Sequence, residues 1–277
     1  MIIKRCFLSE KRVKPKIKSV ASRTNSKNRR TKTIDRKLVK KTTNDSVSKK
    51  RVIDKVEVAQ LLKKLAPSDF GKIFFSDNFS NNVLHFGYRE FPEGYPERYG
   101  IESGWLAILA PMGQDLWGGV PLKMGAPLLL HTAPTGNYGV ECTVDAMWNG
   151  VAQRINTQVG LFVFEDVKNW LFFGFSHHSS QQGAGPQGGG LMITETIGDI
   201  SKIRHLEDFP PMISARLGIE RAGNYWRFYI KEESWRQLGP DIFGPFGSHE
   251  VGMGVKSFQD SGSPQMGYFD NFIIRTN

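Results

Sequence analysis

Cysteine is scarce in this sequence, and long apolar runs are missing from it. The chain has 277 residues but only two cysteines, Cys6 and Cys142, which excludes a disulfide-built scaffold and leaves the redox compartment open. No apolar run approaches the roughly 18 residues that a membrane-spanning helix needs. Hydrophobic residues still make up 39% of the chain and aromatic residues 12%. This composition supports a sizeable core in one large domain or two small ones.

Acidic residues are scarce at one end of the chain. The whole sequence carries 37 Lys and Arg residues against 27 Asp and Glu, a formal net charge of +10. Residues 1–55 hold 20 of the basic and 4 of the acidic residues, which leaves 17 and 23 for residues 56–277. The chain therefore joins a polycation of +16 to a mildly acidic body of −6.

Residues 1–51 also lack aromatic residues, with Phe7 as the single exception. Such a segment buries too little apolar surface to offset the entropy of ordering, so we expect a disordered basic arm. Its basic runs repel one another and attract a polyanion, of which nucleic acid is the commonest. The residues expected to contact the polyanion are Lys11, Arg12, Lys14, Lys16, Lys18, Arg29, Arg30, Lys49, Lys50 and Arg51.

Two other interpretations of the arm stay open. It is a solvated tail without a partner, or a cleaved organellar targeting segment, because Met1–Thr33 has Glu10 as its only acid. A secretory signal is not expected, because the apolar stretches Met1–Ile3 and Cys6–Leu8 are far shorter than an apolar signal core of about 7 to 15 residues. We therefore favour an intracellular or virion-associated location, with organellar targeting as the alternative.

A short amphipathic helix is predicted after the arm. Val58, Leu61, Leu62 and Leu65 share one helical face, and Pro67 ends the pattern. We interpret this helix as a brace packed on the domain that follows, with a partner-binding role as the alternative. The predicted organisation is a basic arm at 1–51, a helix and linker at 52–66 and a β-sandwich domain at 70–277.

From residue 70 onward, short alternating or apolar runs are separated by Gly, Pro and Asn. This texture predicts an all-β jelly-roll sandwich of two antiparallel sheets. The expected strands are Lys72–Phe75, Trp105–Leu109, Leu128–His131, Gly139–Trp148, Gln158–Phe164, Trp170–Ser176, Leu191–Thr196, Met212–Glu220, Tyr225–Lys231, Glu250–Ser257 and Tyr268–Arg275.

Alternation within these runs predicts which side chains face the core. Val140, Cys142 and Val144 fall on one face, and Glu141 and Asp145 fall on the other, which we expect to face water. The same pattern places Trp226 and Phe228 inside and Tyr225, Arg227 and Tyr229 outside, and Leu217 and Ile219 inside with Arg216 outside. The run Trp170–Phe175 is apolar on both faces and should form a central strand.

Several motifs of the body resemble a known superfamily. They are Phe75-Ser76-Asp77-Asn78-Phe79-Ser80, Gly160–Leu171, Ile219–Tyr225, Trp235–Gly239 and Phe269-Asp270-Asn271-Phe272. Together they resemble the concanavalin A-like lectin/glucanase superfamily, most closely a branch that includes an uncharacterised bacterial domain family and accessory domains of some β-xylosidases. The resemblance covers about residues 73–276. It implies a jelly-roll sandwich with a concave face that often binds glycans and sometimes catalyses.

Catalytic acids of that superfamily are not recognisable here. Its laminarinase-type members carry a Glu-x-Asp-x-x-Glu strand, which sets two carboxylates at the short spacing of retaining hydrolysis. Glu141 and Asp145 offer only part of that pattern, because Thr143 stands between them. They are solvated polar positions, or they bind sugar hydroxyls.

A glycan-binding face is the hypothesis for the outward side of these strands. Rings and guanidinium groups beside carboxylates suit sugar recognition, although ordinary cross-strand ion pairs have the same composition. Trp117, next to a turn, and His177, at the start of a Gly-rich loop, are expected at the rim. The candidate ligand residues are Glu141, Asp145, Arg216, Tyr225, Arg227, Tyr229, Trp117 and His177.

Metal and nucleotide motifs are sparse. Asp77 and Asp270 lie near the two ends of the domain, where related sandwiches sometimes bind a structural Ca²⁺; alternatively, both cap turns. The pair His177-His178 has no further ligand at zinc spacing. No Walker loop, dinucleotide fingerprint or nucleophile elbow is present, and no cofactor is expected to be required.

The sequence thus favours a non-catalytic carbohydrate-binding or structural β-sandwich module, tethered to a polyanion by its basic arm. One alternative is a glycoside-active enzyme of the same superfamily. Another is a coat or assembly protein, because a basic arm before a jelly roll is how many capsid subunits combine genome binding with shell formation.

Overall fold

The computed structural model describes residues 66–118, 125–146, 157–177, 189–208, 214–258 and 264–277. The predicted basic arm at 1–51 and the predicted helix at 52–65 lie outside these residues, as does His178. In the part of the chain that is described, no helix has the length and apolar character needed to cross a bilayer.

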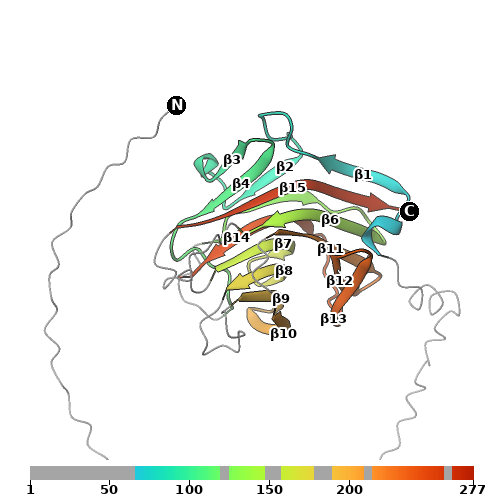
Figure 1. The fold of residues 1–277 in the computed structure, drawn as a ribbon. Helices are drawn as coiled ribbons and strands as arrows, with labels where there is room; N and C mark the ends of the chain where they lie inside the picture. The colour runs from blue at the N-terminus through green and yellow to red at the C-terminus, as the bar shows by residue number, and fades with distance from the viewer. Residues whose placement is uncertain (1–65, 119–124, 147–156, 178–188, 209–213, 259–263) are drawn as a thin grey trace, which may run out of the picture. The chain divides into compact units, whose positions relative to one another are not determined.

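Two antiparallel sheets make up the body, as predicted (Figure 1). In order, the eight-stranded sheet contains β13 (Trp235–Phe243), β12 (Tyr225–Lys231), β11 (Ser214–Ala222), β6 (Tyr138–Asp145), β15 (Gln265–Thr276), β4 (Trp105–Ala110) and β3 (Tyr99–Glu102), and β1 (Lys72–Asp77) also pairs with β15. The seven-stranded sheet contains β10 (Ile200–Asp208), β9 (Gly189–Ile197), β8 (Asn169–His177), β7 (Thr157–Asp166), β14 (Glu250–Ser257), β5 (Leu128–Thr132) and β2 (Tyr88–Phe91). Two short 3₁₀ helices, η1 (Pro67–Asp69) and η2 (Pro96–Arg98), complete the described elements.

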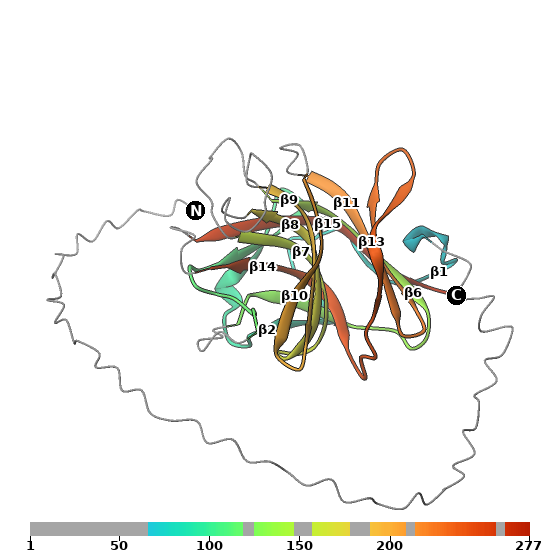
Figure 2. The same ribbon diagram turned by 90° about the horizontal axis from the view of Figure 1, so that it is seen from below.

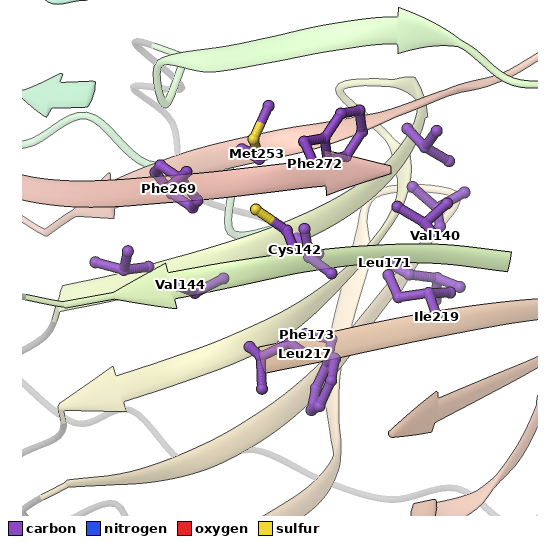
Figure 3. Packing of buried hydrophobic residues seen from close by; sticks show 14 of the residues in the cluster. Val140, Cys142, Val144, Leu171, Phe173, Leu217, Ile219, Met253, Phe269 and Phe272 are labelled. Carbon is purple, nitrogen blue, oxygen red and sulfur yellow. The ribbon is translucent and has the colours of Figure 1, made fainter. Parts of the chain in front are cut away.

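The main core lies between the inner faces of the two sheets. Figure 3 shows side chains of both sheets meeting there, among them Val140, Cys142, Val144, Leu217, Ile219, Leu171, Phe173, Met253, Phe269 and Phe272. Cys142 is buried with a free thiol, as its core position predicted. A second cluster covers the other face of the seven-stranded sheet and includes Phe162, Trp170, Phe172 and Met192, packed under Leu116. The strand β8 is therefore buried on both faces, which confirms the prediction from its two-sided apolar run.

The predicted alternation is confirmed, but the expectation that the outward face is solvated is wrong at several positions. Glu141 is only 4% exposed, Arg227 2% and Tyr229 4%. The reason is that charged and aromatic side chains on neighbouring strands lie across one another and exclude water. Because these groups are buried, their stability depends on the hydrogen-bond and ion-pair partners that the protein supplies.

Four strands escaped the sequence patterns. The strands β2 and β3 have four residues each, too few to show a period. In β10 a bulge between Ile203 and His205 breaks the alternation. In β13 a bulge and Gly239, with φ of 63°, do the same. Both β10 and β13 are edge strands, where such irregularities are tolerated.

The first and last strands of the described domain lie side by side. The strand β1 pairs antiparallel with the C-terminal end of β15, from Lys72 opposite Thr276 to Asp77 opposite Phe272. Both views place β1 beside the end of the chain (Figures 1 and 2). The pairing is made on one side of β1 only, so β1 is an edge strand.

A buried histidine closes one end of the core. His249 is 6% exposed, and its Nδ1 lies 2.8 Å from the carbonyl oxygen of Gly247, so that Nδ1 carries the proton. Its Nε2 then accepts the hydroxyl of Tyr138 at 2.7 Å, and the Trp226 ring lies edge-on at 5.4 Å. Burial is the largest effect that lowers the pKa of His249, and Arg221 lowers it further. The folded protein therefore holds His249 neutral.

We predict a large loss of stability for Trp226→Ala and a small one for Tyr225→Ala. Trp226 is fully buried and donates its Nε1 proton to the Gly244 carbonyl oxygen at 2.9 Å, whereas Tyr225 is 36% exposed. Trp226→Ala should lower the free energy of unfolding by about 3 to 5 kcal/mol, and Tyr225→Ala by less than about 1 kcal/mol. Urea denaturation measures both, and equal losses would mean that the register of β12 is wrong.

We also predict that stability falls as the medium is acidified. Unfolded histidine binds a proton near pH 6.5, while burial lowers the pKa of folded His249. The stabilisation is therefore complete above about pH 6.5 and is lost as the pH falls from there toward the folded pKa. His249→Gln should make the decline of the unfolding free energy between about pH 7 and 5 shallower. Burial lowers the pKa of His131 and His177 too, so some decline should remain; identical slopes would contradict the assignment.

Candidate functional site

The outward side of the eight-stranded sheet carries most of the predicted ligand residues. We call this surface the charged face; it consists of Glu141, Arg216, Glu220, Arg227, Tyr229, Asp241 and Arg275. The register brings them together, because Arg216 lies opposite Thr143, and Glu220 lies opposite Arg227. The sequence thus grouped Glu141, Arg216, Arg227 and Tyr229 on the correct face.

Two arginines hold Glu141 between them. The Nε atom of Arg216 donates to Oε2 and that of Arg275 donates to Oε1, both at 3.0 Å. Arg216 also donates from Nη1 to the hydroxyl of Thr143 at 3.3 Å. Both carboxylate oxygens of Glu141 are therefore occupied within the protein, and the two guanidinium groups balance its buried charge.

A second network surrounds Arg227. Its Nη1 donates to Glu220 at 3.1 Å and its Nε to Asp241 at 2.8 Å. The hydroxyl of Tyr229 donates to the other oxygen of Glu220 at 2.7 Å, and Gln237 donates to Asp241 at 2.8 Å. Burial first, and then the hydrogen bond to Glu220, raises the pKa of Tyr229. This geometry matches the cross-strand ion pairs that the composition also allowed, and the ligand assignment for these residues stays a prediction.

Tyr225 and Asp145 lie at opposite ends of this sheet. Tyr225 pairs with Ala222 at the end of β11, and Asp145 pairs with Ser214 at its start. Ala222 follows Ser214 by eight steps of extended strand, about 27 Å. The two predicted ligand residues therefore cannot contact one sugar ring together.

Trp117 and His177 lie on the seven-stranded sheet, away from the charged face. His177 ends β8, where it pairs with Thr157. Trp117 belongs to the connection between β4 and β5, and its ring lies 5.5 Å from Nζ of Lys256 in β14. The structure does not bring these two residues to the rim of the charged face.

A buried lysine organises the surface around Trp117. Lys256 is fully buried, with Nζ 3.1 Å from Oδ1 of Asp115. Three rings flank the ammonium group: Trp170 at 4.6 Å, Phe258 at 5.3 Å and Trp117 at 5.5 Å. A carboxylate and aromatic faces together compensate a buried cation. We call Lys256, Asp115, Trp117, Trp170 and Phe258 the lysine cluster.

Segment 113–118 crosses this face of the seven-stranded sheet. At one end the Gly113 N–H donates to the Phe258 carbonyl oxygen at 3.3 Å. At the other end the Gly118 N–H donates to the hydroxyl of Ser201 at 2.7 Å. Between them, Leu116 packs on the second apolar cluster. These contacts hold Trp117 in place while its side chain stays partly exposed.

Two buried polar atoms on the same face lack partners. Among the described residues, Gln158 Oε1 and Trp170 Nε1 have no hydrogen-bond partner. The amide nitrogen of Gln158 lies 3.4 Å from the sulfur of Met192, a weak acceptor. Leaving such groups unpaired costs roughly 1 to 3 kcal/mol each. One buried acceptor and one buried donor on this face therefore reduce the stability of the fold.

Sequence reasoning missed the lysine cluster, although a signal was present. In β14, Gly252, Gly254 and Lys256 alternate with Val251, Met253 and Val255, which face the core. A buried charge that follows a run of glycine and apolar residues needs a buried partner. No local pattern points to Asp115 as that partner, because it lies 141 residues away in a loop.

The two candidate calcium ligands each accept a backbone proton. Oδ1 of Asp77 accepts the Phe79 N–H at 2.8 Å, and Oδ1 of Asp270 accepts the Asn271 N–H at 2.7 Å, which is the turn-capping alternative. The two residues do lie on neighbouring strands. In the described part of the chain, no three His, Cys, Asp or Glu side chains gather in a way that could hold a metal ion. The calcium site stays a prediction.

Comparison with known proteins finds similarity in structure only. No protein-family profile matches the chain, and neither does any curated protein sequence. A xylan β-1,4-xylosidase from Bacillus halodurans matches with a TM-score of 0.58 and 18% identity over 77% of this chain and 41% of that enzyme. A GH43 protein from the xyloglucan locus of Bacteroides ovatus matches with a TM-score of 0.56 and 15% identity over 78% of this chain and 40% of that one.

A shorter protein matches over nearly its whole length. This protein of unknown function from Saccharomyces cerevisiae has a TM-score of 0.53 and 14% identity, over 69% of this chain and 97% of its own. At such identities the likeness shows the fold alone, a sandwich that is also found within GH43 enzymes. The chain spans about two fifths of the length of the GH43 enzymes.

We predict that Glu141 supports stability. In Glu141→Gln the two arginines lose the carboxylate that balances them, and the unfolding free energy should fall by about 1 to 3 kcal/mol, less than for a fully buried pair because Arg216 and Arg275 are partly exposed. Glu233→Gln, at an exposed position between β12 and β13, is the control and should change stability by less than about 0.5 kcal/mol. Equal effects of the two substitutions in urea denaturation would contradict the role of Glu141.

Proposed function

We propose that this chain acts on glycosides, and that its sandwich domain recognises the saccharide. The observation that carries the proposal is the match of most of the chain to sandwiches within GH43 enzymes, among them a xylan β-1,4-xylosidase. The match covers less than half of each enzyme, so the proposal concerns recognition first. Hydrolysis by this chain itself is the second candidate.

We place the contact with the saccharide at Trp117. An indole ring stacks on the apolar face of a pyranose, and a ring that is fixed beforehand loses little entropy on binding. Segment 113–118 and Lys256 fix this ring, and its side chain is partly exposed.

The charged face supports this role less well. Glu141 is hydrogen-bonded to Arg216, and Arg227 and Tyr229 are both hydrogen-bonded to Glu220. A sugar would therefore have to displace an ion pair to gain a hydrogen bond there. Hydrolysis faces the same difficulty, because it needs two carboxyl groups about 5 to 9.5 Å apart that act on the substrate. On the charged face, arginines engage Glu141, Glu220 and Asp241.

We predict that Trp117→Ala weakens saccharide binding by about tenfold or more while the fold is kept. Isothermal titration with xylo-, arabino- and xyloglucan-type oligosaccharides measures the affinity. Trp235→Ala is the matched control, since Trp235 is also partly exposed but lies on the other sheet, where Nε1 donates to Ser68 at 2.8 Å. Loss of binding in Trp235→Ala with unchanged binding in Trp117→Ala would move the contact to the eight-stranded sheet.

Release of reducing sugar by the same protein separates recognition from hydrolysis. Turnover that falls by orders of magnitude in Glu141→Gln or Asp145→Asn would establish the enzyme and place its acids on the charged face. Binding without turnover supports the recognition role. If none of these saccharides shows either binding or turnover, the proposal is contradicted.

A further inference from the structure

One contact of the lysine cluster joins two reactive groups that lie almost entirely away from water. Nζ of Lys256 lies 3.1 Å from Oδ1 of Asp115, and the two side chains are 0% and 8% exposed. The rings of Trp170, Phe258 and Trp117 flank Nζ at 4.6 to 5.5 Å. An amine and a carboxyl group that are held together in this way are the two halves of an amide bond.

Backbone hydrogen bonds beside the two side chains fix this contact. The Ser257 N–H donates to the Gln114 carbonyl oxygen at 2.9 Å. These two residues are the direct neighbours of Lys256 and Asp115 in the sequence. Segment 113–118 and the end of β14 are therefore bonded to one another where the amine and the carboxyl group meet, and the two groups stay in contact.

The carboxyl group of Asp115 is also polarised by its own segment. Its Oδ1 accepts the Leu116 N–H at 2.6 Å. In a site without water, a backbone N–H stabilises negative charge that develops on a carbonyl oxygen. The Leu116 N–H therefore favours attack of a nucleophile on Cγ of Asp115.

The buried charges can be removed without moving either side chain. A proton that passes from Nζ to the carboxylate turns the ion pair into an amine and a carboxylic acid, which avoids the desolvation cost of two charges. An uncharged lysine amine is a nucleophile. The aromatic rings favour the ammonium form, so the reaction is slow. Exclusion of water from the site also slows the reverse reaction, hydrolysis of the amide.

We propose that Lys256 and Asp115 become joined by an amide bond between Nζ and Cγ. Nζ first passes one proton to Oδ2 of Asp115. The lone pair of Nζ then forms the bond to Cγ, and Oδ1 takes up the negative charge beside the Leu116 N–H. A second proton moves from Nζ to Oδ2, the bond between Cγ and Oδ2 breaks, and the electron pair on Oδ1 restores the C=O bond. The products are one amide and one water molecule, and no other reactant is consumed.

The bond ties segment 113–118, and Trp117 with it, to β14. It closes a loop from residue 115 to residue 256, and such a crosslink restricts the unfolded chain. This inference does not depend on the proposed function, because it holds whether or not the chain binds saccharides.

Intact mass spectrometry of the full chain, denatured after purification, tests this bond. The native protein should weigh one water molecule less than its sequence. Lys256→Met and Asp115→Ala should both have the full mass of their sequences. Lys231→Met is the matched control, because Lys231 is exposed and its Nζ lies 5.6 Å from the Trp235 ring; this variant should keep the loss of water.

Digestion with trypsin locates the bond. The joined protein should release one branched peptide made of residues 99–123 and 237–275, because trypsin does not cut after a lysine whose amine has lost its charge by acylation. This peptide comes from the native protein alone, so a variant that fails to fold leaves the test intact.

Two outcomes would overturn the proposal. One is a native protein of full sequence mass that yields separate peptides of residues 99–123 and 237–256. The other is a loss of water that occurs without the branched peptide, as from a cyclised aspartate elsewhere, or that persists in Lys256→Met.

Discussion

The hydrogen-bonded pairing of β15 is the interaction on which the eight-stranded sheet depends. This strand bonds to β6 along one side and to both β4 and β1 along the other. As the last strand of the domain it pairs with the first, and it joins β3 and β4 to β6, β11, β12 and β13. Phe269, Phe272 and Ile274 of the same strand reach into the core. Without β15 the sheet would separate into three parts, β1 alone, β3 with β4, and β6 with β11, β12 and β13, and the core would lose the side chains of β15.

Buried charges are compensated differently on the two sheets. On the charged face, arginines and carboxylates from neighbouring strands satisfy one another, so the surface is held together by its own polar groups. On the seven-stranded sheet, a single ammonium group is balanced by one carboxylate and three rings, and polar atoms of Gln158 and Trp170 nearby stay unpaired. A sugar on the charged face would have to displace these internal hydrogen bonds, whereas the partly exposed ring of Trp117 offers a stacking surface without that cost.

Much of the fold was predictable from the sequence, because a regular period of two determines which side chains face the core. The patterns around Cys142, Leu217 and Trp226 predicted the inner faces of β6, β11 and β12. The edge strands β10 and β13 escaped, since the bulges near Ile203 and Gly239 interrupt their alternation. The candidate site was predictable only in part. Trp117 could be recognised as a ring beside a turn, but its contact with Lys256 joins residues far apart in the sequence, and spacing carries no information about such contacts. The polyanion partner of the basic arm remains a prediction from charge alone.

The pairing of Lys256 with Asp115 also constrains how this sequence can diverge. Replacing the lysine alone would leave a buried carboxylate, and replacing the aspartate alone would leave a buried ammonium group, each a costly intermediate. Replacing both by apolar residues of similar volume is far less costly. In diverging relatives the two positions should therefore change together, so that co-variation between a loop and a strand distant in sequence would mark this face.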